Sequence, residues 1–182
     1  MGIYKSLGVF AAITLLASCN PGQAWKKRTI DNKEKSIMDA AKKGKIDTTG
    51  VKDLLAAYDA YVAAYPTDSS DANYLFKEAD FYRYMHKPAK SISIYQRIYT
   101  DFPQFFKRPY CLFLQGFIYE NEVKNLDSAR AKYELFLATY PNHQIAKDVR
   151  ITIANMGKTS EQLIQEFEAR QHADSLSTSN AK

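Results

Sequence analysis

The apolar positions of the chain recur at the three- and four-residue spacings of amphipathic helices. The stretch VKDLLAAYDAYVAAY, from residue 51, shows this periodicity, as does HQIAKDVRITIAN from residue 143. These spacings predict an all-α fold, in which a small residue on one helix lets a paired helix come close. Two segments place a large residue, a small residue and a tyrosine at i, i+4 and i+7, namely Leu75, Ala79, Tyr82 and Leu112, Gly116, Tyr119.

Three aromatic-proline pairs divide this helical region into repeats, and the prolines are spaced by 37 and 38 residues. The pairs are Tyr65-Pro66, Phe102-Pro103 and Tyr140-Pro141, and each proline has a tyrosine eight residues before it, namely Tyr58, Tyr95 and Tyr133. Because the residue before proline is pushed out of the α region, each pair predicts the end of a helix. The expected repeats cover about residues 33–66, 67–103, 104–141 and 142–172.

Several polar and special residues predict where helices begin and end. Pro88 suits the first turn of a helix, where its missing N–H costs nothing, and Asn125 offers a capping oxygen in the next repeat. Gly157 predicts a helix end. Thr159 and Gln162 form a predicted capping box for a last helix, and residues 173–182, ADSLSTSNAK, are expected to form a disordered tail.

The N-terminal eighteen residues have the order of a secretory signal peptide, with Lys5 before a short apolar run that is too short to span a membrane. Leu16-Ala17-Ser18-Cys19 resembles the bacterial lipobox, which implies cleavage before Cys19 and a diacylglycerol on its sulfur. Durable anchoring requires two or more acyl chains. Asn20 follows in place of the aspartate typical of inner-membrane retention, so the resemblance implies a lipid-anchored outer-membrane protein. Residues 20–28, NPGQAWKKR, contain no acidic export tract, which favours a protein that faces the periplasm.

Positive charge is concentrated beside this anchor. Residues 19–50 carry twice as many basic as acidic side chains, whereas residues 51–172 carry fifteen of each sign. The segment 19–32 is expected to be a lipidated tether, and Trp25, Lys26, Lys27 and Arg28 are candidates for contact with the membrane surface. A solvated linker with scattered charge is the alternative. Nucleic acid binding is disfavoured because the folded part is charge-neutral.

The repeat resembles the tetratricopeptide repeat (TPR) family, in which a bulky residue, Gly or Ala, and Tyr on a first helix pair with Ala, an aromatic residue, Ala and Pro on a second. Ala129, Tyr133, Phe136 and Pro141 match the second helix, whereas Ser91 stands where alanine is usual. The resemblance implies a right-handed α-solenoid of three to four TPR-like helix pairs over residues 33–172. A solenoid also needs a terminal helix with a polar outer face.

The period exceeds the usual TPR length of about 34 residues, with extra residues after each proline. This spacing resembles envelope TPR proteins, namely the BamD-like lipoproteins of outer-membrane β-barrel assembly and the YbgF (CpoB)-like proteins of the Tol-Pal system. The first resemblance implies a membrane-anchored scaffold for another envelope protein. A Tol-Pal or peptidoglycan-associated adaptor, or a structural spacer without a bound ligand, stays open. The chain lacks the N-terminal coiled coil of YbgF-like proteins.

Transferring the TPR pattern residue by residue predicts a groove for an extended or helical peptide with apolar anchors. Aromatic side chains are frequent hot spots, and Arg83 is expected to pair with an acidic group of the partner. The alternative is that neighbouring helices cover some of these aromatic residues. The predicted groove residues are Asn73, Phe76, Asp80, Arg83, Tyr84, Tyr110, Phe113, Phe117, Glu120 and Asn121.

Nothing in the residue pattern favours an enzyme. His86, His143 and His172 stand at no ligand-like spacing, so neither a metal nor a small-molecule cofactor is expected. Phosphate-binding and hydrolase motifs are missing from the sequence. Cys111, within YCLFLQGF, is expected to be a small core residue. Apart from the lipid on Cys19, the expected partner is therefore a protein.

Overall fold

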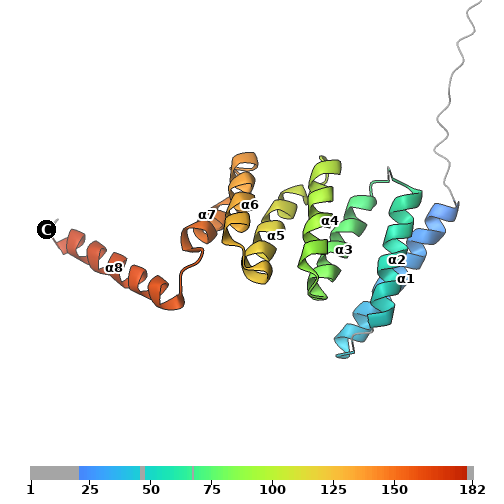
Figure 1. The fold of residues 1–182 in the computed structure, drawn as a ribbon, viewed down its shortest axis with the longest axis horizontal. Helices are drawn as coiled ribbons and strands as arrows, with labels where there is room; N and C mark the ends of the chain where they lie inside the picture. The colour runs from blue at the N-terminus through green and yellow to red at the C-terminus, as the bar shows by residue number, and fades with distance from the viewer. Residues whose placement is uncertain (1–20, 46–47, 67, 180–182) are drawn as a thin grey trace, which may run out of the picture. The chain divides into compact units, whose positions relative to one another are not determined.

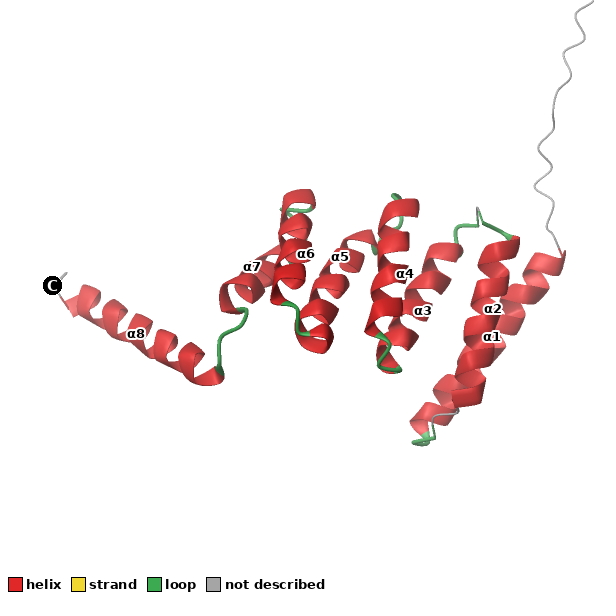
Figure 2. Ribbon diagram, in the orientation of Figure 1, coloured by secondary structure: helices red, strands yellow, loops and turns green. Residues whose placement is uncertain are grey.

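The computed structural model describes residues 21–45, 48–66 and 68–179, with side chains given up to residue 172. Over these residues the chain forms eight α-helices and one short π-helix, and no strand (Figure 2). The prediction of an all-α fold is confirmed. The signal peptide at residues 1–18 and the lipidation site Cys19 lie outside the described residues.

The backbone divides into two compact units, with the boundary inside the second helix. The first unit contains α1 (Pro21–Lys42) and α2 (Thr48–Ala64) as far as Ala57. Ile30, Val51, Leu54 and Leu55 are its buried apolar side chains.

The start of α1 differs from the prediction, which placed a tether over residues 19–32 and a first helix from about Lys33. The helix begins at Pro21, a favourable residue for a first turn. Trp25 and Ile30 are the only large apolar residues in positions 21–32, so the periodicity there is weak. Burial of Ile30 nevertheless gives this segment an apolar contact, and residues 21–32 are helical.

The second unit begins at Tyr58 and contains five further helices in chain order before the last one. These are α3 (Asp71–Tyr84), α4 (Pro88–Asp101), α5 (Arg108–Ile118), α6 (Leu126–Thr139) and α7 (Ala146–Asn155). From α3 to α7, each helix packs against the next, and Figure 1 shows α3 to α6 side by side. The π-helix η1 (Tyr119–Val123) extends α5, and α8 (Ser160–Ser179) ends the described chain.

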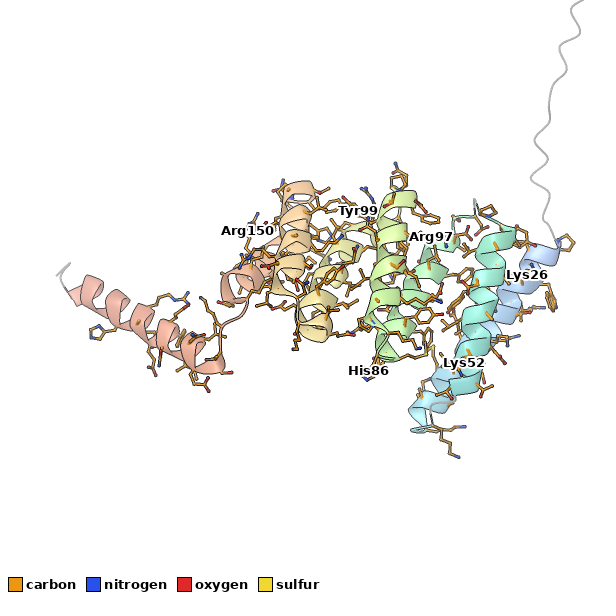
Figure 3. All side chains as sticks on the ribbon, in the orientation of Figure 1. Lys26, Lys52, His86, Arg97, Tyr99 and Arg150 are labelled. Carbon is orange, nitrogen blue, oxygen red and sulfur yellow. The ribbon has the colours of Figure 1, made fainter. Side chains whose placement is uncertain are left out.

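The predicted proline stops are confirmed at all three aromatic-proline pairs. Helix α2 ends at Ala64, α4 at Asp101 and α6 at Thr139, in each case directly before the aromatic residue. Pro88 is the first residue of α4, and His86 lies in the turn before it with a positive φ of 54° (Figure 3).

The predicted caps are confirmed as well. The side chain of Asn125 accepts a hydrogen bond from the Ser128 N–H at 2.9 Å. Thr159 N–H donates to Gln162 Oε1 at 2.9 Å, and Gln162 N–H donates back to Thr159 Oγ1 at 3.3 Å, which completes the capping box. Gly157 has a φ of +79° after α7, a conformation that favours glycine.

The prediction of a disordered tail is wrong for residues 173–179, because α8 continues to Ser179. The segment after His172 contains neither glycine nor proline, so nothing in its backbone chemistry ends the helix that the capping box begins. Residues 180–182 lie outside the described chain.

The repeated tyrosines Tyr58, Tyr95 and Tyr133 occupy the core of the second unit and are fully buried. Cys111 is fully buried too, which confirms it as a core residue, and burial raises the pKa of its thiol to about 12. Ser91, at the position where alanine is usual, donates a hydrogen bond from its hydroxyl to the Ala79 carbonyl at 2.8 Å. Its polar group is therefore satisfied inside the α3–α4 contact.

Candidate functional site

The ten predicted groove residues fall into three groups with different roles. The first group consists of two acceptors for buried tyrosines. Tyr95 donates its hydroxyl hydrogen to Asp80 at 2.7 Å, and Tyr133 donates to Glu120 at 2.9 Å. Burial, with the adjacent carboxylate, raises the pKa of both phenols, so both keep their donor hydrogen. Asp80 and Glu120 therefore help to hold neighbouring helices together.

The second group surrounds Arg83 and lies along α3, α5 and η1. The Arg83 guanidinium carbon lies 5.6 Å from the Tyr84 ring centre and 5.9 Å from that of Phe117. Tyr84 is 78% exposed. Arg83 also approaches Asp80 of its own helix at 4.0 Å, so the predicted acidic partner of Arg83 has a competitor within the chain.

Two members of this region serve the fold. Asn121 Nδ2 donates to the Phe117 carbonyl at 3.0 Å. The Phe113 ring centre lies 5.8 Å from that of Tyr133, and Phe113 packs on the buried cluster around Leu112 and Phe136. Phe113 is therefore in part a core residue, as the alternative interpretation of the groove anticipated.

The third group, Asn73, Phe76 and Tyr110, lines two neighbouring depressions in the second unit. The larger, which we call the aromatic depression, is an open hollow of about 760 Å³. It is lined by Phe76 of α3, Tyr110 of α5 and residues of two inter-helix loops, Phe106, Lys107, Asn142, His143 and Gln144.

Phe106 forms the wall between the aromatic depression and a smaller hollow of about 400 Å³. Asn73 of α3 lies in the smaller hollow, together with Phe102, Pro103 and Phe105. Phe106 is 71% exposed, and its ring meets that of Phe105 edge to face at 5.2 Å. A large aromatic side chain thus projects into solvent between two concave surfaces.

The electrostatics of the aromatic depression are set by one cation. Lys107 Nζ lies 4.8 Å from the Phe76 ring centre and 5.4 Å from that of Phe106, at distances where the ring faces attract an ammonium group. Within the described part of the chain Lys107 forms no ion pair, and no acidic side chain lines this depression. The surface therefore combines apolar rings with an uncompensated positive charge.

Neighbouring contacts fix the two loops that form the depression. Arg108 donates from Nε to the Tyr99 carbonyl at 2.8 Å and from Nη1 to the Tyr140 hydroxyl at 3.0 Å, and its guanidinium carbon lies 4.3 Å from the Tyr99 ring centre. The Arg108 side chain therefore ties the start of α5 to the ends of α4 and α6. Lys107 immediately precedes this fixed point.

The second loop is held against α5 by side-chain contacts. Gln144 Nε2 donates to the Tyr110 hydroxyl. The His143 ring meets Tyr110 at 5.3 Å and Phe136 at 5.6 Å, both edge to face. His143, in the turn between α6 and α7, packs between a lining residue and a core residue.

Sequence reasoning missed five residues of the aromatic depression: Phe106, Lys107, Asn142, His143 and Gln144. A signal for them was present, because these residues belong to the extra positions that follow the second and third prolines. Helical periodicity does not say where loop side chains point, so the pattern could not assign them to a surface.

The four candidate membrane-contact residues lie on α1, in the first unit. Trp25 is 66% exposed and Arg28 is exposed, whereas Lys26 and Lys27 are half-buried. Trp25 and Arg28, three residues apart, share one side of the helix. Contact of these residues with a membrane stays a prediction.

Comparison with known proteins gives no family for this chain: neither the protein-family models nor the curated proteins contain a match. Among the described helices, none is both long and apolar enough to cross a bilayer. The described residues also contain no cluster of three or more His, Cys, Asp or Glu side chains placed to hold a metal ion.

Proposed function

We propose that this protein is a membrane-anchored scaffold that binds a segment of another envelope protein. In this proposal the helices form a right-handed α-solenoid of three to four TPR-like pairs, and a lipid on Cys19 ties them to the outer membrane on its periplasmic side. The repeated aromatic-proline helix ends and the buried tyrosines at equivalent positions support the repeat.

The single observation that carries the binding role is the aromatic depression. It is open, concave and lined by three aromatic rings, and it holds an ammonium group without an ion-pair partner in the described chain. Exposed aromatic side chains grouped around concave surfaces are characteristic of protein interaction sites. Two loops fixed by Arg108, His143 and Gln144 hold this surface in shape, which limits the entropy lost on binding.

The leading assignment is a BamD-like role in outer-membrane protein assembly, supported by the lipobox resemblance and by the lengthened repeat. The alternative is a Tol-Pal or peptidoglycan-associated adaptor that resembles YbgF (CpoB), and a spacer without a groove ligand is the third possibility. All three share the anchor and the helical repeat. They differ in whether a protein contacts the depression and, for the first two, in which protein it is.

Site-specific photocrosslinking in intact cells tests this proposal. A photoreactive amino acid replaces Phe106 in the full-length chain, and a matched control places it at Leu135, an exposed position on α6. Crosslinked proteins are then identified by mass spectrometry. Barrel-assembly components captured at position 106 and not at 135 would support the leading assignment, and Tol-Pal or peptidoglycan factors the alternative. Equal capture at both positions would contradict a binding role for the depression.

A further inference from the structure

The last described helix, α8, carries an apolar face that is largely exposed among the residues that the structure describes. Ile164 is 57% exposed and Phe167 is 58% exposed. Together with Leu163 these side chains fall within about a third of the helix circumference at 100° per residue. A three-residue apolar face that stays in contact with water is unfavourable by the transfer free energy of its side chains.

An acidic edge runs beside this apolar face. Glu161 and Glu168 are seven residues apart, two turns along the same side of α8, and both are exposed. Neither forms an ion pair within the described residues, in contrast to Glu166, which contacts Lys158 at 2.7 Å and Arg170 at 3.7 Å. The face therefore presents apolar side chains bordered by two carboxylates.

The aromatic depression has the opposite character. Its rings come from Phe76, Phe106 and Tyr110, and its one cation, Lys107, has no ion pair in the described part of the chain. A ligand that matches it supplies apolar side chains next to a carboxylate, as the α8 face does. Charge complementarity of this kind favours one partner over others and fixes the register of binding.

We infer that α8 of one copy binds in the aromatic depression of a second copy of this chain. Ile164 and Phe167 enter the hollow beside Phe106, and the edge formed by Glu161 and Glu168 faces Lys107. The two patches are different surfaces of the same molecule. The contact is therefore heterologous, and it links copies head to tail.

This inference rests on the proposed function in one respect only: both require the depression to be a binding surface. A second copy and an envelope partner then compete for the same site. Self-association would be strongest where the anchored protein is crowded and no partner is present, and partner binding would release α8.

Co-purification of two differently tagged full-length copies from detergent-solubilised membranes tests the contact. Wild-type copies are expected to co-purify. Lys107→Glu alone, and Glu161→Lys with Glu168→Lys, should each reduce recovery about tenfold, because like charges then meet at the interface. Combining all three substitutions in every copy restores opposite charges and should restore recovery. Glu134→Lys, an exposed reversal on α6, is the matched control and should change nothing.

Photocrosslinking from position 171 on α8 identifies the occupant. Crosslinks from one tagged copy to the loops around Phe106 and His143 of the other are expected. Crosslinks confined to the same copy would show that α8 folds back, and would overturn the inference. Absence of co-purification in the wild type, or recovery insensitive to the charge reversals, would also overturn it. Capture of an envelope protein at position 106 would still support the proposed function in those cases.

Discussion

The ring of Tyr133 on α6 lies directly over Gly116 on α5, so close that a side chain at residue 116 has no room. A Cβ atom on Gly116 would lie 2.5 Å from Tyr133 Cε1 and 2.7 Å from Cδ1. Tyr133 cannot easily move, because it is fully buried and its hydroxyl is bonded to Glu120 at 2.9 Å. The absence of a side chain at Gly116 therefore determines how closely α5 and α6 pack.

Gly116→Ala should destabilise the protein by about 1–3 kcal/mol, the usual cost of overpacking a core. The sign of the stability change is informative, because Gly→Ala at an open helical position stabilises a protein by about 1 kcal/mol. Chemical denaturation followed by circular dichroism measures the free energy of unfolding. In a Tyr133→Leu background the same substitution should cost markedly less, because the clashing ring is gone. A stabilised Gly116→Ala variant would contradict the close approach.

The close approach of a paired helix at Gly116 was predicted from the sequence, although its partner Tyr133 was not, and the reason is local. Three kinds of signal act through nearby backbone geometry or steric fit. They are a small residue in the middle of an apolar trio, a proline after an aromatic residue, and an Asn or Thr before a helix. Pro88, Asn125 and the Thr159–Gln162 capping box accordingly appear where they were expected.

The candidate site was predicted less well, because its residues are brought together by tertiary contacts. Phe76 and Tyr110 were identified from helical positions, whereas Phe106 and Lys107 lie in a loop whose side-chain directions follow no period. Asp80 and Glu120 were predicted to line the groove, but each instead accepts a hydrogen bond from a buried tyrosine. A buried phenol hydroxyl needs such an acceptor. The pattern alone does not show which helix supplies that acceptor.

Glu78 of α3 is a buried carboxyl group, only 2% exposed. Burial raises its pKa to about 7, and the charge of Asp59 on α2 acts in the same direction, while Lys90 and Arg97 on α4 oppose the shift. The ordinary value of this pKa is 4.5. Between pH 4.5 and about pH 7, Glu78 therefore keeps its proton in the folded chain and releases it in the unfolded chain.

The free energy of unfolding should consequently fall as the pH rises through this window. The stability that protonated Glu78 contributes is fully present below about pH 4.5 and is lost above about pH 7. It amounts to at most about 3 kcal/mol at 1.36 kcal/mol per pKa unit. Glu78→Gln should flatten the decline and raise stability at about pH 8. Urea titrations at several pH values measure this, with Glu134→Gln, an exposed carboxyl, as control. Parallel profiles for wild type and Glu78→Gln would contradict the prediction.

Cys19→Ala should abolish membrane anchoring, since the lipobox cysteine carries the lipid in the proposed function. Cell fractionation followed by immunoblotting is the measurement, and the expected product is an uncleaved or soluble chain. Trp25→Ala with Arg28→Ala is the comparison, because it removes surface contacts of α1 and leaves the lipid. A Cys19→Ala protein that is processed normally and stays in the outer membrane after a high-salt wash would disprove the anchor.

Phe106 and Phe113 should respond differently to truncation, and the comparison separates binding from folding. Phe113 packs against Tyr133, so Phe113→Ala should lower the free energy of unfolding by about 2 kcal/mol or more. Phe106 is largely exposed, so Phe106→Ala should change stability by less than about 0.5 kcal/mol. Crosslinked pull-downs with a photoreactive residue at Gln144, another residue that lines the depression, should nevertheless lose the envelope partner in Phe106→Ala. Full partner recovery with Phe106→Ala, and loss only with Arg83→Ala, would move the binding surface to the cluster around Arg83, Tyr84 and Phe117.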